Sequence, residues 1–224
     1  MLKKNFFYIA AMMAVCFMGC STPSSTPEAT NKPSDKIGDI AYFKDGKCFV
    51  HSGYDSSYGQ PIGVVFEVKN GTAQKIVGLD KWNSKLWALD TAEGYEKKFE
   101  TSEDDGSENW NIICDNVDDE NGTNCYMAFT CFQYHTAGNQ NWYLPAINEL
   151  KAIAANKEVI KTSIDLLNEN TDLDFEFPIT GFFWSSSQDP EHVGCALYVY
   201  LDNNTNGYNG KTSGYGVLAV SKLQ

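Results

Sequence analysis

Alternating apolar and polar residues predict two β-hairpins in the first half of the chain, over residues 40–50 and 63–79. Each alternation is interrupted once, by Asp-Gly at 45–46 and by Asn-Gly at 70–71. These dipeptides favour the left-handed backbone of a two-residue hairpin turn, and the flanking alternation is typical of strands with one buried face. The region 80–119 has no sustained period, so we expect long loops with short elements there.

Helical spacing of apolar residues follows in three segments. The first spans 122–135, directly after an acidic run that suits a helix N-terminus. The second opens at Pro145, because proline is well placed in the first turn of a helix. Its inner face would hold Ile147, Leu150, Ile153 and Ala154. A third helical segment is predicted over 157–167.

The last third of the chain returns to strand patterns, over 182–187, 195–201 and 215–221. In the middle segment, aliphatic residues alternate with Tyr198 and Tyr200, which predicts one aliphatic and one aromatic face. Antiparallel strands at both ends, flanking two or three helices, predict an α+β fold. We expect one domain with its termini close together.

The N-terminal residues predict an exported, lipid-anchored protein. A basic start precedes an apolar run over 6–19, which is short for a membrane span but suits a secretory signal. The run ends at Cys20 in a pattern that resembles the bacterial lipobox, in which the cysteine is lipidated; an ordinary signal peptide is the alternative. We therefore expect a signal peptide over 1–19, a lipid-anchored flexible linker over 20–36 and a folded domain over 37–224.

The composition restricts the partners of this domain. The chain has 17 basic residues, all of them lysine, against 29 acidic ones, and its net charge is −12. Without arginine it lacks the bidentate fork that recognises phosphate, and its negative charge opposes binding to nucleic acid. We expect no nucleic-acid partner, and membrane attachment only through acyl chains on Cys20. The oligomeric state is not predicted.

Cysteines offer little chemistry in this pattern. Apart from Cys16 and Cys20, five remain, an odd number that leaves at least one free thiol. Their spacing matches no zinc or dithiol motif. We expect buried thiols with at most one disulfide, and two disulfides are the alternative. The five are Cys48, Cys114, Cys125, Cys131 and Cys195.

Three segments in order carry a family resemblance. The first segment, residues 42–46 with 61–66, corresponds to the start of the domain. The second, residues 141–150, reads Asn-Trp-Tyr-Leu-Pro-Ala-Ile-Asn-Glu-Leu, and the third, residues 183–187, contains Trp-Ser-Ser. The second segment is similar to Trp-x-Leu-Pro-x-x-x-Glu-Leu of the DUF1566 domain, also called the Legionella collagen-like adhesin C-terminal type. The chain resembles that domain over roughly residues 40–224.

This resemblance implies a C-type-lectin-like fold and a role in adhesion. Some members of the family bind sulfated glycans through a basic surface. This chain has Tyr143 at a position that is often arginine in the family, so we do not carry sulfated-polymer binding over. The same fold superfamily contains formylglycine-generating enzymes, so an oxidative role for Cys114, Cys125 or Cys195 is the alternative; a purely architectural envelope protein is a third.

Several residues of these segments are interpreted as structural. Trp142 and Leu144 would pack where the chain enters the second helix, and Glu149 would accept hydrogen bonds from nearby backbone N–H groups. The structural set is Trp142, Leu144, Pro145, Glu149, Leu150 and Trp184.

No residue pattern supports catalysis, a metal or a cofactor. Ser185, Ser186 and Ser187 lack the Gly-x-Ser-x-Gly elbow of a nucleophilic serine, and we interpret them as strand residues with satisfied hydroxyls. The acidic run at 115–120 lacks the spacing of a calcium loop and is interpreted as solvated. We expect a non-catalytic protein without a metal ion or cofactor.

The strongest candidate for recognition is the tyrosine- and asparagine-rich segment 198–216. Aromatic rings and side-chain amides are common on binding surfaces. A glycine-rich hairpin with left-handed asparagines is the plainer alternative. The ligand-binding candidates are Tyr198, Tyr200, Tyr208, Asn209 and Tyr215. With them, the sequence predicts a cell-envelope lipoprotein that binds a neutral glycan or a protein.

Overall fold

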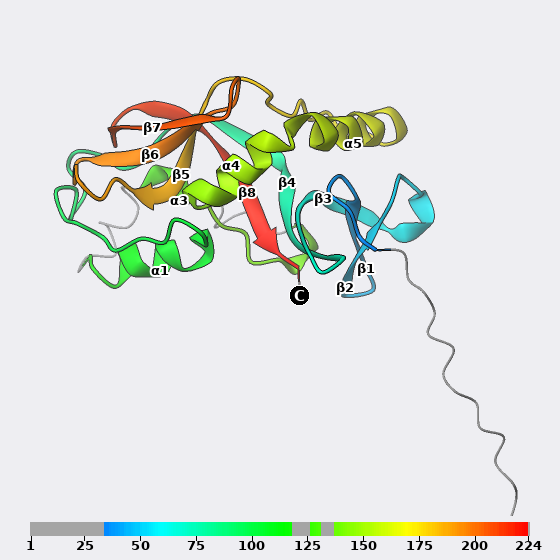
Figure 1. Ribbon diagram of the computed structural model, residues 1–224. Helices are drawn as coiled ribbons and strands as arrows, with labels where there is room; N and C mark the ends of the chain where they lie inside the picture. The colour runs from blue at the N-terminus through cyan, green and yellow to red at the C-terminus, as the bar shows by residue number, and fades with distance from the viewer. Residues whose placement is uncertain (1–33, 118–125, 131–136, 224) are drawn as a thin grey trace, which may run out of the picture. The chain divides into compact units, whose positions relative to one another are not determined.

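Eight strands form one mixed sheet, in the order β2-β1-β3-β4-β8-β5-β6-β7. The computed structural model describes residues 34–117, 126–130 and 137–223 (Figure 1). The strands are β1 (Ile40–Lys44), β2 (Lys47–His51), β3 (Gln60–Lys69), β4 (Thr72–Leu86), β5 (Phe182–Gln188), β6 (Cys195–Tyr200), β7 (Thr205–Gly210) and β8 (Gly214–Lys222).

The helices lie between β4 and β5 in the chain, so the fold is α+β. Short 3₁₀ turns occur at Ser56–Tyr58, Gly106–Glu108 and Ala137–Asn139. The α-helices are α1 (Asn109–Cys114), α3 (Met127–Thr130), α4 (Ile147–Ala155) and α5 (Lys157–Asn170). Among the described residues, no helix has the length and apolar character needed to cross a membrane.

Both predicted hairpins are confirmed. Asp45 and Gly46 have φ values of 52° and 77°, and Asn70 and Gly71 have values of 53° and 71°. Two consecutive left-handed residues make the turn whose twist matches that of the flanking strands. The two turns connect β1 to β2 and β3 to β4.

Two expectations about the elements are wrong in part. The strand β4 continues to Leu86, into a region expected to be loops, because residues 81–86 pair with β8 from the other end of the chain. The strand β5 runs parallel to β8, at Phe183 and Gly216, where antiparallel strands were expected. The hydrophobic periodicity of a strand indicates which of its residues face the core, but it does not identify the strand with which it pairs in the sheet.

The helix boundaries also differ slightly from those expected. The helix α4 begins at Ile147 with Ala146 as its N-cap, so Pro145 precedes the helix. The third helical segment is confirmed as α5 and continues to Asn170. Of the helix expected over 122–135, only residues 126–130 are described, and they contain α3.

The sheet is covered on both faces. On one face, α4 and α5 pack against β3, β5 and β6 (Figure 1). On the other, the chain between β4 and α4 contributes Trp87, Phe99, Tyr126 and Phe129 to a second apolar cluster, which also contains Trp184 of β5. The two ends of the described domain both reach β4, because the Asp35 carboxylate accepts from the Ala73 N–H at 3.0 Å and Leu223 donates its N–H to the Gln74 carbonyl.

Candidate binding site

The Trp-Tyr-Leu-Pro segment lies against β8. Tyr143 and Val220 exchange both backbone hydrogen bonds, at 2.9 and 3.0 Å, which fixes the segment that leads into α4. Trp142 and Leu144 are buried in the cluster below the sheet. Leu150 is buried on the helix-covered face. These positions are inside the domain and offer no exposed surface to a ligand.

Glu149 is a buried hydrogen-bond acceptor at the start of α4. Its carboxylate accepts from the backbone N–H groups of Ala146 and Gly106, at 2.8 and 3.0 Å, and from the Tyr143 hydroxyl at 2.9 Å. Lys75 completes the network with an ion pair of 2.7 Å. Burial and the adjacent Glu149 carboxylate raise the pKa of Tyr143. Burial alone would lower the pKa of Lys75, but its carboxylate partners raise it.

The three consecutive serines of β5 are fully buried and hydrogen-bonded. The Ser185 hydroxyl donates to the Leu197 carbonyl at 2.8 Å, and the Ser187 hydroxyl donates to the Ser102 carbonyl at 2.8 Å. The Ser186 oxygen accepts from the Asn109 amide at 2.7 Å. None of the three is exposed to solvent.

Three of the predicted ligand-binding tyrosines come together on the sheet face that also carries Trp184. Tyr198 and Tyr215 meet edge to face, with their ring centroids 5.2 Å apart. Tyr200 joins them through Phe182, which stacks on Tyr200 at 4.6 Å and on Tyr215 at 5.2 Å. The predicted Asn209 also belongs here, because its amide donates to the Tyr215 hydroxyl at 2.6 Å.

Sequence reasoning missed Phe182 as a member of this group. Phe182 is 42% exposed although its ring lies between two tyrosines. We call Phe182, Trp184, Tyr198, Tyr200 and Tyr215 the aromatic cluster. Trp184 forms its buried base, with its ring 4.4 Å from that of Tyr215. The period-two spacing of Phe182 and Trp184 places both on one face and was the available signal.

Tyr208 lies apart from the aromatic cluster. It pairs with Leu197 across β6 and β7, and Leu197 belongs to the helix-covered face. Directly paired residues of antiparallel strands share a face, so Tyr208 points away from Tyr198 and Tyr200. Its ring stacks on His192 at 4.5 Å. The predicted set of five therefore divides between the two faces of the sheet.

Two tryptophans of the region 80–119 lie in the interior and add nothing to an exposed binding surface. Trp87 is fully buried, and its indole N–H donates to the Ser185 carbonyl at 2.8 Å. Trp110 stacks on Phe129 at 5.4 Å in the same interior cluster. These rings stabilise the layer below the sheet.

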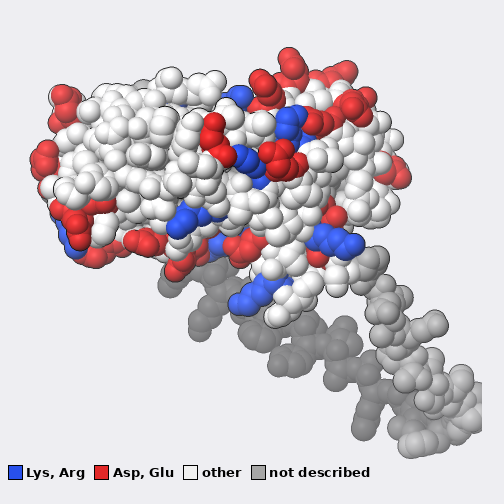
Figure 2. All heavy atoms as spheres, turned by 45° about the horizontal axis from the view of Figure 1, so that its top comes forward, with Lys and Arg blue, Asp and Glu red and all other residues white. Residues whose placement is uncertain are grey.

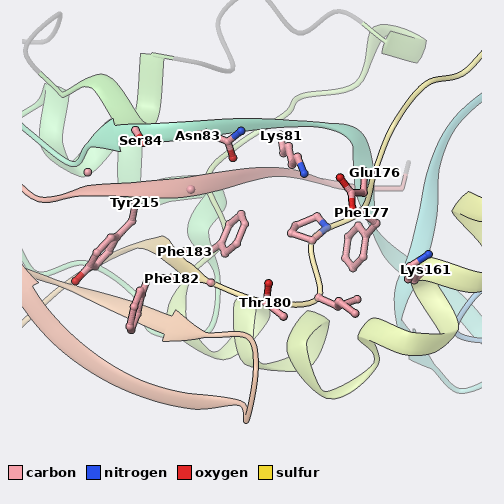
Figure 3. A pocket seen from close by; sticks show the side chains of 15 residues that line it. Lys81, Asn83, Ser84, Lys161, Glu176, Phe177, Thr180, Phe182, Phe183 and Tyr215 are labelled. Carbon is pink, nitrogen blue, oxygen red and sulfur yellow. The ribbon is translucent and has the colours of Figure 1, made fainter.

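A groove of about 590 Å³ adjoins the aromatic cluster where β5 diverges from β8 (Figure 3). We call it the Phe183 groove. Phe182 and Tyr215 belong to both features. The groove is lined by Lys81, Asn83, Ser84, Lys161, Glu176, Phe177, Pro178, Ile179, Thr180, Gly181, Phe182, Phe183, Gly214, Tyr215 and Gly216.

Local backbone geometry opens this groove. The register between β4 and β8 shifts between Trp82 and Lys85, and Ser84 has a left-handed φ of 53°. Such irregularities interrupt the hydrogen-bond ladder between β4 and β8 and reorient the side chains there. Asn83 and Ser84 line the groove at this interruption. On the floor, a Cβ at Gly216 would lie 2.5 Å from the Phe183 ring, so only glycine lets this ring lie against the β8 backbone.

The opposite wall is held by Lys157 at the start of α5. Its amine donates to the carbonyls of Ile179, Leu201 and Asp202, at 3.1, 2.5 and 3.0 Å. Gly181, with a φ of 98°, donates its N–H to the Asp202 carboxylate at 2.9 Å. These contacts fix the segment that contains Thr180 relative to β6.

Charged residues border the aromatic cluster but are absent from the strands β5, β6 and β7. The Asp202 side chain is hydrogen-bonded to Tyr200, and Lys85 of β4 pairs with Tyr215 of β8. None of the residues in β5, β6 and β7 is acidic or basic. Figure 2 shows a broad surface without charged side chains toward the strands β6 and β7, whereas acidic side chains gather near α5. In a chain of net charge −12, the three strands β5, β6 and β7 are unusual because they contain no charged residue.

The described thiols are poorly suited to nucleophilic chemistry. Cys48, Cys114 and Cys195 are half-buried, and no disulfide joins them. Burial raises the pKa of each of the three thiols. A reactive cysteine needs a lowered pKa. Cys125 and Cys131, with Cys16 and Cys20, lie outside the described residues.

No metal site is formed by the described part of the chain, in which three or more His, Cys, Asp or Glu side chains nowhere gather closely enough to hold an ion. The acidic residues at 118–120, considered above for calcium, lie outside it. The expectation of no metal ion or cofactor stays a prediction.

Comparison with known proteins supports the fold alone. No family model and no curated protein matches the chain, so the resemblance to the DUF1566 domain stays a prediction. A solved structure described as a fimbrial protein from Bacteroides ovatus ATCC 8483 aligns with a TM-score of 0.56 and 14% sequence identity. The alignment covers 84% of this chain and 49% of that chain, so this protein spans about half the length of the structure it matches. This chain is thus similar in fold to part of a bacterial fimbrial protein.

Proposed function

We propose that this chain is a lipid-anchored protein of the bacterial cell surface whose domain recognises a ligand and catalyses no reaction. The ligand class is a neutral glycan or a protein. The C-type-lectin-like fold and the DUF1566 membership implied by the sequence resemblance belong to this proposal, as does the adhesive role suggested by the fimbrial protein's description.

The aromatic cluster carries the proposal. Phe182 is 42% exposed in a protein that otherwise buries its large apolar side chains well; of the described residues, only Val159 and Tyr208 are exposed to a similar degree. Exposed aromatic rings with amide and hydroxyl groups at their edges are the residue types that recognition surfaces favour. Here Asn209 and the hydroxyl of Tyr215 supply that polar edge.

The described thiols do not favour the oxidative alternative. It requires a thiolate at Cys114, Cys125 or Cys195. Cys125 lies outside the described residues, and burial raises the pKa of the other two thiols. The neighbouring carboxylates of Asp115 and Asp189 add to this effect, because negative charge disfavours a thiolate.

A binding assay with paired variants tests the proposal. The full chain is applied to an array of glycans and to proteins extracted from the surface of co-resident bacteria. The double variant Phe182→Ala with Tyr200→Ala is expected to lose at least tenfold in affinity for whatever is captured, since removing anchoring aromatics costs more than about 1 kcal/mol each. Tyr208→Ala, on the other face, is the matched control.

Two results would count against this assignment. Equal binding by the double variant and the wild-type chain would remove the aromatic cluster from the site. A loss confined to Tyr208→Ala would move the site to the helix-covered face of the sheet.

A further inference from the structure

We infer that the Phe183 groove binds one neutral, hydroxyl-rich unit, a sugar residue of a glycan. The inference rests on the proposed recognition function and names the class of ligand and the residues that contact it. None of the groove's polar wall residues belongs to the set predicted from the sequence, which shares only Tyr215 with the lining.

The polar wall offers complementary hydrogen-bonding groups. Lys81 can only donate, the Glu176 carboxylate can only accept, and Asn83, Ser84 and Thr180 can do both. Figure 3 shows the ends of Lys81, from β4, and Glu176 close to one another at one end of the groove, with Thr180 on the opposite side. Within the described part of the chain, no hydrogen bond or ion pair engages these five side chains.

A sugar matches this arrangement because each hydroxyl both donates and accepts. Adjacent hydroxyls of one ring can accept from the Lys81 amine and donate to the Glu176 carboxylate at once. An anionic ligand would leave the carboxylate unmatched, and a cationic ligand would leave the amine unmatched, each at a cost in affinity. The wall therefore selects for a polar ligand without net charge.

The other charged residue of the lining does not alter this balance. Lys161 is engaged by Asp165 one helical turn away, at 2.6 Å. With Lys161 neutralised, Lys81 and Glu176 are a balanced pair in a groove whose remaining lining is uncharged. Beyond the groove, the strands β5, β6 and β7 also contain no charged residue.

The floor supplies the apolar contact that a sugar ring needs. The rings of Phe177 and Phe183 are buried at the base, and Phe182 is exposed at the border with the aromatic cluster. The C–H face of a sugar buries apolar area against such rings, while its hydroxyls stay with the polar wall. A wholly apolar ligand would leave the hydrogen-bonding groups of the polar wall unused.

The groove is of suitable size and already formed. Its volume of about 590 Å³ lies within the usual range for small-ligand sites, roughly 300–1,000 Å³. The hydrogen bonds of Lys157 to three carbonyls hold one wall in place. A preformed site loses less conformational entropy on binding.

Calorimetric titration of the full chain tests the inference. The probes are neutral trisaccharides of glucose, mannose, galactose and N-acetylglucosamine, each beside an oligosaccharide of uronic acids of equal length. At least one neutral probe is expected to bind, and the uronic acids are not. Lys81→Met and Thr180→Val remove one hydrogen-bonding group each and keep the side-chain volume, so each is expected to weaken binding about five- to tenfold.

A matched control removes the same charge elsewhere. Lys69→Met changes an exposed lysine at the far end of β3 and is expected to bind as the wild type does. Weakening by Lys81→Met and Thr180→Val but not by Lys69→Met supports the groove. Circular dichroism and the unfolding midpoint of each variant exclude a folding defect.

The opposing outcomes separate this inference from the proposed function. Tighter binding of the uronic acids, or no binding of any neutral probe, overturns the sugar assignment. If Lys81→Met and Thr180→Val bind normally while Phe182→Ala with Tyr200→Ala does not, the aromatic cluster is the site and the groove is not. Capture of a protein with no sugar bound also overturns the groove inference and leaves the recognition proposal standing.

Discussion

Lys211 is a fully buried lysine in the layer below the sheet. Its amine donates to the Tyr95 carbonyl at 2.7 Å and lies 5.1–5.5 Å from the ring centroids of Trp87, Tyr95 and Phe99. Burial lowers its pKa to about 8, and the nearby Glu96 carboxylate only partly opposes that effect. The rings favour the charged amine, but they compensate little of the lost hydration.

This lowered pKa predicts a pH dependence of stability that belongs to Lys211 alone. Between pH 8 and about 10.5, the unfolded chain carries a protonated lysine and the folded chain a neutral one, so raising the pH stabilises the fold. Relative to Lys211→Met, the wild-type chain should gain about 3 kcal/mol of unfolding free energy across that interval. Guanidinium unfolding of both proteins at pH 7, 8.5 and 10 measures the difference.

Comparison with the variant is needed because other groups act in the opposite direction. Burial raises the pKa values of Cys114, Cys195 and Tyr143 in the folded chain. The unfolded chain therefore loses these protons first, and raising the pH lowers the free energy of unfolding. The contributions of Cys114 and Tyr143 are the same in both proteins and cancel in the difference. Cys195 is coupled electrostatically to Lys211, so both proteins carry Cys195→Ala in this comparison. Parallel pH profiles for wild type and Lys211→Met would contradict the assigned pKa.

Residue roles were predictable from sequence where they depend on near neighbours. Glu149 was expected to accept from backbone N–H groups, and Ala146, three residues away, is one such donor. Two further partners, Lys75 and Gly106, are 74 and 43 residues distant in the chain. No local pattern identifies them, because the tertiary fold alone brings them together.

At the scale of elements, the turn of the first hairpin offers a direct test of backbone strain. Gly46 has a φ of 77° and open space around its missing Cβ, whereas Gly210 has equal space and an ordinary φ. Gly46→Ala should therefore cost about 1 kcal/mol through conformation alone. Gly210→Ala should be neutral or slightly stabilising, and unfolding midpoints in urea give both values. Equal effects of the two substitutions would show that φ is not the cause.

Elements were predictable where local chemistry encodes them. The Asx-Gly turns, the apolar face of α4 and the alternation in β6 all follow from residues within a few positions of one another. The extension of β4 to Leu86 was not predictable, since it depends on pairing with β8 more than 125 residues later in the chain. The parallel pairing of β5 with β8 has the same origin.

The candidate site shows the same division. Alternation correctly places Tyr198 and Tyr200 on one face of β6, but it cannot report that β7 pairs so that Tyr208 faces the other way. The groove was not predictable at all, because its walls come from β4, β8 and the segment before β5. The ligand-binding residues predicted from one continuous segment therefore include only one wall of a groove that three segments of the chain line.

At the scale of the whole molecule, charge is distributed unevenly. The acidic residues that give the chain its net charge of −12 leave β5, β6 and β7 uncharged. An acidic surface repels anionic surfaces over a long range, and salt screens this repulsion. Contacts between uncharged groups depend little on the salt concentration. A neutral ligand has no net charge for salt to screen, so its binding at the aromatic cluster and the Phe183 groove should change little with ionic strength, as titrations at low and high salt would measure.

Cys20, which lies outside the described residues, decides whether this domain is anchored. If the sequence pattern around it directs lipidation, metabolic labelling with an acyl-chain probe should mark the wild-type chain. Cys20→Ser should abolish the label and release the protein from the membrane fraction, because burial of acyl chains supplies the binding energy. Cys16→Ser, within the predicted signal peptide, is the matched control and should keep both the label and the membrane location. A label that survives Cys20→Ser would place the acyl chains on another residue, and absence of the label from the wild-type chain would refute the anchor.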